Sequence, residues 1–67
     1  MRRVRVLVVE DERDKRDAVR DEIRSFFEGG VEIEECTTFG QAVRSLSRSP
    51  FDLVVTDLLL PRLEGQT

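Results

Sequence analysis

Cysteine is almost absent from this chain of 67 residues: Cys36 stands alone, so no disulfide can form within the chain. Long apolar runs are absent as well, and no stretch is long enough for a signal peptide or a membrane-spanning helix. These two absences remove the sequence features of secreted and membrane proteins. We therefore expect a cytoplasmic protein that makes no contact with a membrane.

An excess of positive charge is also lacking. The chain carries 11 lysine and arginine residues against 14 acidic ones, and its formal net charge is −3. Because the two signs are interleaved, no basic face large enough to neutralise nucleic-acid phosphates is evident. The sequence thus predicts that this chain does not bind nucleic acid directly.

The material for a hydrophobic core is limited. With 39% hydrophobic and 37% charged residues, the composition is that of one small folded domain and not of a disordered segment. A domain of this length buries a small share of its surface, so its stability as an isolated monomer should be marginal. A partner or a further segment of chain would increase that stability.

Three short segments are predicted to be strands. Residues 4–9 and 51–56 are nearly continuous apolar runs, which is typical of strands that are buried on both faces of a sheet. Residues 31–37 alternate between apolar and acidic side chains before they become polar, and this pattern indicates a strand at the edge of a sheet.

Two helices are predicted between these strands. Apolar residues recur at spacings of three and four on an otherwise charged segment from residue 12 to 28, which Gly29-Gly30 ends. The Thr38-x-x-Gln41 sequence has the form of a capping box and begins the second helix, which ends at Ser49-Pro50. The apolar stripe of the first helix consists of Ala18, Val19, Ile23, Phe26 and Phe27, and that of the second consists of Phe39, Ala42, Val43 and Leu46.

Carboxylates stand where the two apolar strands end. The alternation of strands and helices implies parallel strands with right-handed crossovers, so the carboxyl ends of the strands share one edge. Glu10 and Asp11 follow the first strand and Asp57 follows the third, and open α/β sheets place their ligand sites at this edge. Three carboxylates so close repel one another unless a cation lies among them, and oxygen ligands suit Mg²⁺. The pattern predicts a metal-assisted phosphoryl site.

Each of these carboxylates also has a simpler structural interpretation. Asp11 can cap the amino end of the first helix, where acidic residues interact favourably with the helix dipole. Asp57 can be a loop residue that caps the end of a strand. Asp52 interrupts the apolar run of residues 51–56, and we interpret it as the start of the strand, bonded to local backbone groups.

Four sequence elements carry a resemblance to a known family. They are Val8-Val9-Glu10-Asp11-Glu12 after the first strand, the segment from Phe51 to Asp57, the pair Leu60-Pro61, and Glu64-Gly65. At these spacings, and over nearly the whole chain from residue 3 onward, the sequence resembles the receiver domain of bacterial response regulators. That domain is the phosphoacceptor part of two-component signalling.

The resemblance implies a flavodoxin-like α/β fold and a set of site residues. Asp57 would be the nucleophile that accepts a phosphoryl group from a sensor histidine kinase. Asp11 and Asp57 would bind Mg²⁺ directly, Glu10 would act through a bound water, and the backbone carbonyl of Leu59 would supply a further oxygen. Such a chain is a signalling phosphoacceptor and not an enzyme, and at most it promotes its own Mg²⁺-dependent phosphorylation.

The sequence departs from the family pattern after Gly65, because it stops at Thr67. We therefore expect residues 1–67 to form a partial receiver, a parallel sheet truncated after its third strand. The Ser or Thr that the family carries after its fourth strand, and the Lys after its fifth, have no counterpart here. Two alternatives follow: an unphosphorylated module that dimerises through the exposed edge of its third strand or is completed by a second half, or a fragment of a longer regulator.

Overall fold

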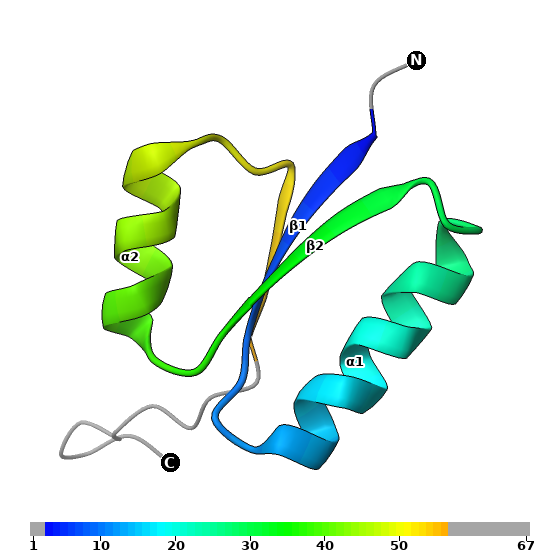
Figure 1. The fold of residues 1–67 in the computed structure, drawn as a ribbon, viewed down its shortest axis with the longest axis horizontal. Helices are drawn as coiled ribbons and strands as arrows, with labels where there is room; N and C mark the ends of the chain where they lie inside the picture. The colour runs from blue at the N-terminus through cyan, green and yellow to red at the C-terminus, as the bar shows by residue number, and fades with distance from the viewer. Residues whose placement is uncertain (1–2, 57–67) are drawn as a thin grey trace, which may run out of the picture.

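The computed structural model describes residues 3–56 of the chain. They form one three-stranded sheet with a helix on either side, as Figure 1 shows. In chain order the elements are β1 (Val4–Val9), α1 (Arg13–Phe26), β2 (Val31–Cys36), α2 (Phe39–Arg48) and β3 (Leu53–Thr56). This order is that of a truncated flavodoxin-like α/β fold, so the fold class predicted from the sequence is confirmed.

The three strands are parallel and follow one another across the sheet in the order β2-β1-β3. In the central strand, Val6 is paired with Ile33 of β2 on one side and with Leu53 of β3 on the other. The side chains from Val6 to Val9 are at most 1% exposed, which confirms the prediction of a strand buried on both faces. The edge position predicted for β2 is also confirmed, because β2 ends the strand order.

Strand β3 is less buried than its apolar sequence predicts. Leu53 and Val54 retain 44% and 43% of their exposure, although they point to opposite faces of the sheet. Within residues 3–56, β3 pairs with β1 along one edge, and no other described strand lies along its second edge. The prediction of a strand buried on both faces is therefore wrong for β3, whereas the predicted exposed edge is present.

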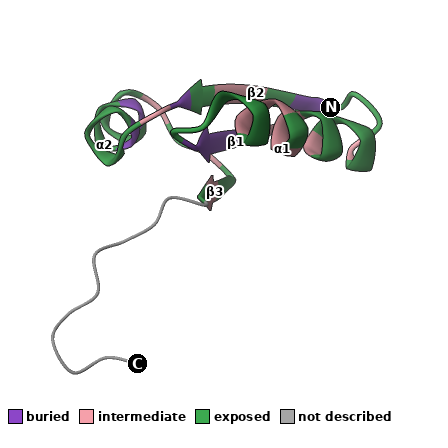
Figure 2. Cartoon of the chain, turned by 90° about the horizontal axis from the view of Figure 1, so that it is seen from below, coloured by how far each residue is buried: buried purple, intermediate pink, exposed green. Residues whose placement is uncertain are grey.

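Alternate side chains of β1 belong to two separate apolar clusters, one beneath each helix. The cluster beneath α1 consists of Val6, Val8 and Val31, with Val19, Ile23 and Phe27 among the residues packed against them. The cluster beneath α2 consists of Leu7, Val9, Cys36 and Ala42, with Phe51 packed against them. Figure 2 shows that burial is concentrated in the sheet and that the helices are largely exposed. The core of the described residues is therefore thin and depends on β1.

Helix α1 begins after Glu12 and not after Asp11. Glu12 has extended backbone angles and is the N-cap, but its side chain makes no capping hydrogen bond. Its backbone N–H donates instead to the Glu10 carboxylate, at 2.8 Å. The alternative interpretation of Asp11 as the helix cap is therefore wrong, because the cap position falls one residue later and Glu10 accepts the hydrogen bond there.

The apolar stripe predicted for α1 is only partly covered. Val19, Ile23 and Phe27 pack against the sheet, but Ala18 is exposed and Phe26 is 79% exposed. The Phe26 and Phe27 rings meet edge to face with their centroids 5.0 Å apart. The C-terminal turn of α1 thus presents an aromatic surface to solvent.

The turn that ends α1 places a glutamate where glycine is usual. The N–H of Glu28 donates to the Ser25 carbonyl and the N–H of Gly29 donates to the Arg24 carbonyl, which is the Schellman pattern. Glu28 has φ 51° and Gly29 has φ 83°. Gly29 contributes to the helix end, as predicted, but the left-handed position next to the helix is occupied by Glu28.

We expect Glu28→Gly to stabilise the protein by about 0.5–1 kcal/mol, because glycine adopts positive φ without the steric cost that Cβ imposes. The measurement is the free energy of unfolding in urea, followed by circular dichroism. Glu22→Gly is the matched control, because Glu22 is an exposed residue within α1 and glycine there should cost about 1 kcal/mol. A loss of stability in both variants would contradict the prediction.

Helix α2 begins with the predicted capping box. The Thr38 hydroxyl accepts from the Gln41 N–H at 3.1 Å. The return arm differs from the usual form, because the Gln41 side chain accepts from the N–H of Thr37, one residue earlier, at 2.8 Å. The sequence therefore located this helix start correctly.

The apolar face predicted for α2 is only partly covered by the sheet. Phe39, Val43 and Leu46 are 42%, 62% and 45% exposed, whereas Ala42 and Ser45 are the buried residues of the helix. The Ser45 hydroxyl bonds to the Glu34 carboxylate of β2, and Arg48 donates to the same carboxylate at 3.3 Å. Hydrophobic periodicity alone did not predict this orientation of α2, in which the helix makes polar contacts with β2.

Asp52 joins the start of β3 to β1. Its carboxylate accepts from the Arg5 N–H at 2.8 Å, and its own N–H donates to the Arg5 carbonyl at 2.8 Å. The Arg5 guanidinium lies 4.6 Å from the centre of the Phe51 ring and donates to the Pro50 carbonyl. Asp52 marks the start of the strand as predicted, but its carboxylate accepts from the backbone of the neighbouring strand and not from a local group.

Candidate acidic site at the carboxyl edge of the sheet

The sheet register directs the two acidic segments toward one edge. Val9 of β1 and Thr56 of β3 are aligned partners in the parallel ladder. Glu10 follows Val9, and Asp57 follows Thr56 in the sequence. Asp57 itself lies outside the described residues. The carboxyl ends of β1 and β3 are thus level, as the sequence analysis required for a shared site.

Glu10 is a buried carboxylate with one oxygen bound and one oxygen free. The residue is 2% exposed, and its backbone N–H donates to the Cys36 carbonyl at 3.0 Å. Oε2 accepts from the Glu12 N–H, whereas Oε1 is buried without a hydrogen-bond partner among residues 3–56. An acceptor buried without a partner is costly, and a hard cation is one of the groups that can satisfy it. The chemistry of Glu10 therefore fits the metal site predicted from the sequence.

Asp11, the second predicted ligand, is exposed at the start of the loop between β1 and α1. The described part of the chain holds no group of three carboxylate, cysteine or histidine side chains placed to bind a metal ion. The other two predicted ligands, Asp57 and the Leu59 carbonyl, lie outside the described residues. Residues 3–56 therefore contribute two carboxylates to the predicted set.

A basic residue that the sequence analysis did not single out contacts this loop. Arg16 donates from Nη1 to the Glu10 carbonyl at 3.2 Å, and its Nε lies 3.5 Å from the Glu35 carboxylate of β2. Its side chain is 19% exposed. Its position within a charged helical segment is equally typical of a solvated face, so no local pattern distinguishes it from the neighbouring charges.

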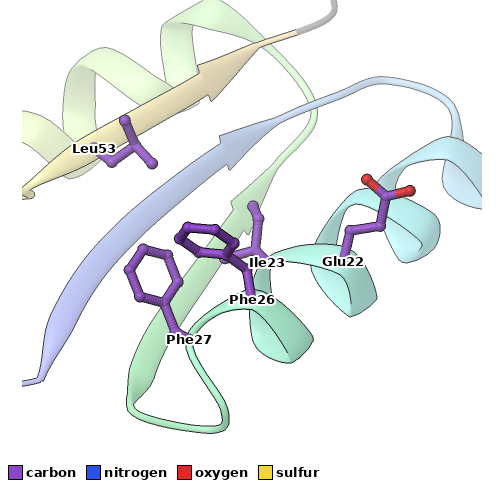
Figure 3. A pocket seen from close by; sticks show the side chains of 5 residues that line it. All are labelled: Glu22, Ile23, Phe26, Phe27 and Leu53. Carbon is purple, nitrogen blue, oxygen red and sulfur yellow. The ribbon is translucent and has the colours of Figure 1, made fainter.

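The Cys36 thiol and an apolar hollow beside α1 are two further features of the described residues. Burial raises the pKa of the Cys36 thiol above its ordinary value, and the nearby Glu34 charge raises it further, so the thiol is a poor nucleophile. A hollow of about 320 Å³, shown in Figure 3, is lined by Glu22, Ile23, Phe26, Phe27 and Leu53. It lies at the C-terminal half of α1, whereas the acidic loop precedes the first turn.

A family comparison agrees with the strand order, the register and the acidic loop. The model of the response regulator receiver domain matches residues 6–67 of this sequence. The chain belongs to the response regulator receiver family. The match begins within β1 and covers the acidic loop and β3, so the resemblance predicted from the sequence elements is confirmed.

A curated relative supports the same assignment of this receiver. An uncharacterized response regulatory protein of Yersinia pestis is 33% identical over 63 residues, which cover 92% of this chain and 26% of the relative. The receiver sequence thus spans about a quarter of that relative's length. No solved structure matches it significantly. In the described part of this receiver, no helix is long and apolar enough to cross a membrane.

Proposed function

We propose that this receiver accepts a phosphoryl group on Asp57 from a sensor histidine kinase, with Mg²⁺ held in the acidic pocket. The observation that supports the proposal best is the buried Glu10 Oε1, which has no partner among residues 3–56 and lies in the loop after β1. A site that buries an unpaired anionic oxygen is suited to a cation. Family membership supplies the second support, because the receiver model covers Asp57.

The residues have different roles in this proposal. The Asp57 carboxylate attacks phosphorus, a new oxygen–phosphorus bond forms, and the bond from phosphorus to the histidine nitrogen of the kinase breaks. Asp11 and Asp57 would hold Mg²⁺ directly, Glu10 would hold a water of the ion, and Leu59 would contribute its carbonyl. When bound, Mg²⁺ would neutralise charge on the phosphoryl oxygens. The product is an acyl phosphate, and the chain acts as a stoichiometric acceptor and not as a turnover enzyme.

Intact mass spectrometry after incubation with acetyl phosphate tests this proposal. One phosphoryl adduct per chain, present with Mg²⁺, absent with excess chelator and removed by hydroxylamine, is the expected result. Circular dichroism on the same sample establishes that the protein is folded. A folded protein that gains no adduct at any Mg²⁺ concentration would contradict the proposal.

The exposed edge of β3 favours a second candidate function, self-association. Leu53 and Val54 expose opposite faces of a short apolar strand whose second edge has no partner strand among residues 3–56. Such an edge is a template for pairing with another strand. Two copies that pair through β3 would form one continuous sheet of order 2-1-3-3′-1′-2′, with two separate acidic sites.

Sedimentation equilibrium tests this second candidate. We expect the unmodified chain to sediment as a dimer and Val54→Lys to sediment as a monomer, because a charge on an edge strand opposes pairing with another strand. Val43→Lys is the matched control: Val43 is 62% exposed on α2, away from β3, so this variant should remain a dimer. A folded, monomeric unmodified chain would contradict the candidate.

A further inference from the structure

The loop that carries the acidic pair is held at three points, and one of them is a side chain from α1. Glu10 donates its N–H to Cys36 of β2 and binds the Glu12 N–H with Oε2. Its carbonyl accepts from Arg16 at 3.2 Å. The backbone N–H, the backbone carbonyl and one carboxylate oxygen of Glu10 are therefore bound, and Oε1 is the oxygen that is left for a ligand.

A second contact, with Glu35, holds the Arg16 side chain in position to bind the Glu10 carbonyl. Its Nε lies 3.5 Å from the Glu35 carboxylate, and the two side chains are 19% and 29% exposed. Glu35 is aligned with Val8 in the sheet register, so the ion pair fixes the guanidinium relative to β1, the strand that Glu10 follows. The planar guanidinium can serve two acceptors at once from one rigid group, which a lysine ammonium at the end of a flexible chain does less well.

We propose that Arg16 is a positioning residue for the acidic site: its guanidinium bridges the Glu10 carbonyl and the Glu35 carboxylate, and it thereby holds the Glu10 and Asp11 carboxylates in place for a divalent cation. The inference rests on the proposed Mg²⁺-dependent function. Arg16 makes no hydrogen bond or ion pair to the Glu10 or Asp11 carboxylates within residues 3–56. Arg16 therefore occupies neither Glu10 Oε1 nor the Asp11 carboxylate, while it anchors the backbone carbonyl of Glu10.

Arg20 provides an internal control because it shares one partner with Arg16 but not the other. Its Nη1 lies 3.8 Å from the Glu35 carboxylate and 3.1 Å from the Asp17 carboxylate. Among residues 3–56, Arg20 makes no hydrogen bond to Glu10. Arg16→Met and Arg20→Met each remove one positive charge from the same face of α1. Loss of charge alone should strengthen the binding of a cation, since it removes electrostatic repulsion.

The test is the Mg²⁺ affinity of the 67-residue chain, measured by titration calorimetry with MgCl₂. We expect Arg16→Met to weaken binding about 10-fold, as is typical when a group that orients a ligand is removed. Arg20→Met should leave the affinity unchanged or slightly higher, and Arg16→Lys should fall between Arg16→Met and the unmodified chain. Unchanged or higher affinity in Arg16→Met would overturn the inference, as would equal losses in Arg16→Met and Arg20→Met.

A second measurement separates this inference from the proposed function. Hydrogen exchange of the Glu12 amide, followed by nuclear magnetic resonance without Mg²⁺, reports how firmly the loop is held. Exchange should be faster in Arg16→Met than in Arg20→Met and the unmodified chain. If the unmodified chain does not bind Mg²⁺, the proposed function fails, but the exchange rate still decides whether Arg16 holds the loop. Should Arg16→Met fail to fold, Arg16→Lys serves for both measurements, and equal exchange in Arg16→Lys and the unmodified chain would overturn the inference.

Discussion

The Asp57→Asn protein should gain no phosphoryl group under conditions in which the unmodified chain gains one. The amide of asparagine has the size of the carboxylate but lacks the anionic oxygen that attacks phosphorus, so the expected effect is complete loss of the adduct. The measurement is intact mass after incubation with acetyl phosphate and Mg²⁺. Circular dichroism spectra of both proteins show whether the substitution has left the fold intact.

Asp52→Asn is the matched control for this experiment. Asp52 carries the same side chain five positions earlier, and its carboxylate accepts from the Arg5 N–H at the opposite end of β3. An asparagine oxygen can still accept that hydrogen bond, so the variant should remain folded and take up one phosphoryl group. An adduct that persists in Asp57→Asn, or that disappears in Asp52→Asn while the protein stays folded, would show that Asp57 is not the acceptor.

Sequence patterns predicted the parts of the fold that depend on hydrogen bonds within one turn or on burial of both faces of a strand. The central strand was recognisable because both its faces are buried, which leaves a run of apolar residues ending at Val9. The start of α2 was recognisable because Thr38 and Gln41 satisfy backbone groups within one turn. These signals require no knowledge of the rest of the molecule.

The features that were missed depend on contacts between elements distant in the sequence. Periodicity located the apolar side of α2, but the side that packs is set in part by Ser45 and its bond to Glu34 of β2. Likewise, Arg16 differs from the neighbouring charges only through its contacts with the Glu10 carbonyl and with the Glu35 carboxylate of β2. A period of 3.6 residues identifies a stripe on a helix but not the neighbour that will cover it.

The acidic site lies between these two cases. Glu10 was selected because it follows a buried strand, and it is 2% exposed with Oε1 unpaired among residues 3–56; its role at a metal stays a prediction. The sequence did not indicate that Glu10 also binds the N–H of Glu12 at the start of α1. The carboxylate that is predicted to act at the metal therefore also accepts from the N-cap residue of α1.

Leu7→Ala should unfold most of the protein at 25 °C. Leu7 is fully buried in the central strand and packs with Val9, Cys36 and Ala42. Truncation of a buried leucine costs about 2–5 kcal/mol through lost burial and the cavity left behind. A domain of this size is expected near or below the lower end of the usual range of about 5–15 kcal/mol, so the loss is comparable to its whole stability.

Urea unfolding followed by circular dichroism measures this loss of stability. Leu46→Ala is the control, because it makes the same substitution at a partly exposed site. Leu46 is 45% exposed on the outer side of α2, so its truncation should cost only about 0.5–1 kcal/mol. A large difference between the two variants would show that the fold depends on the thin layer of side chains on β1. An equal loss in both would mean instead that the exposed face of α2 is covered in solution, either by a further segment of chain or by a second copy.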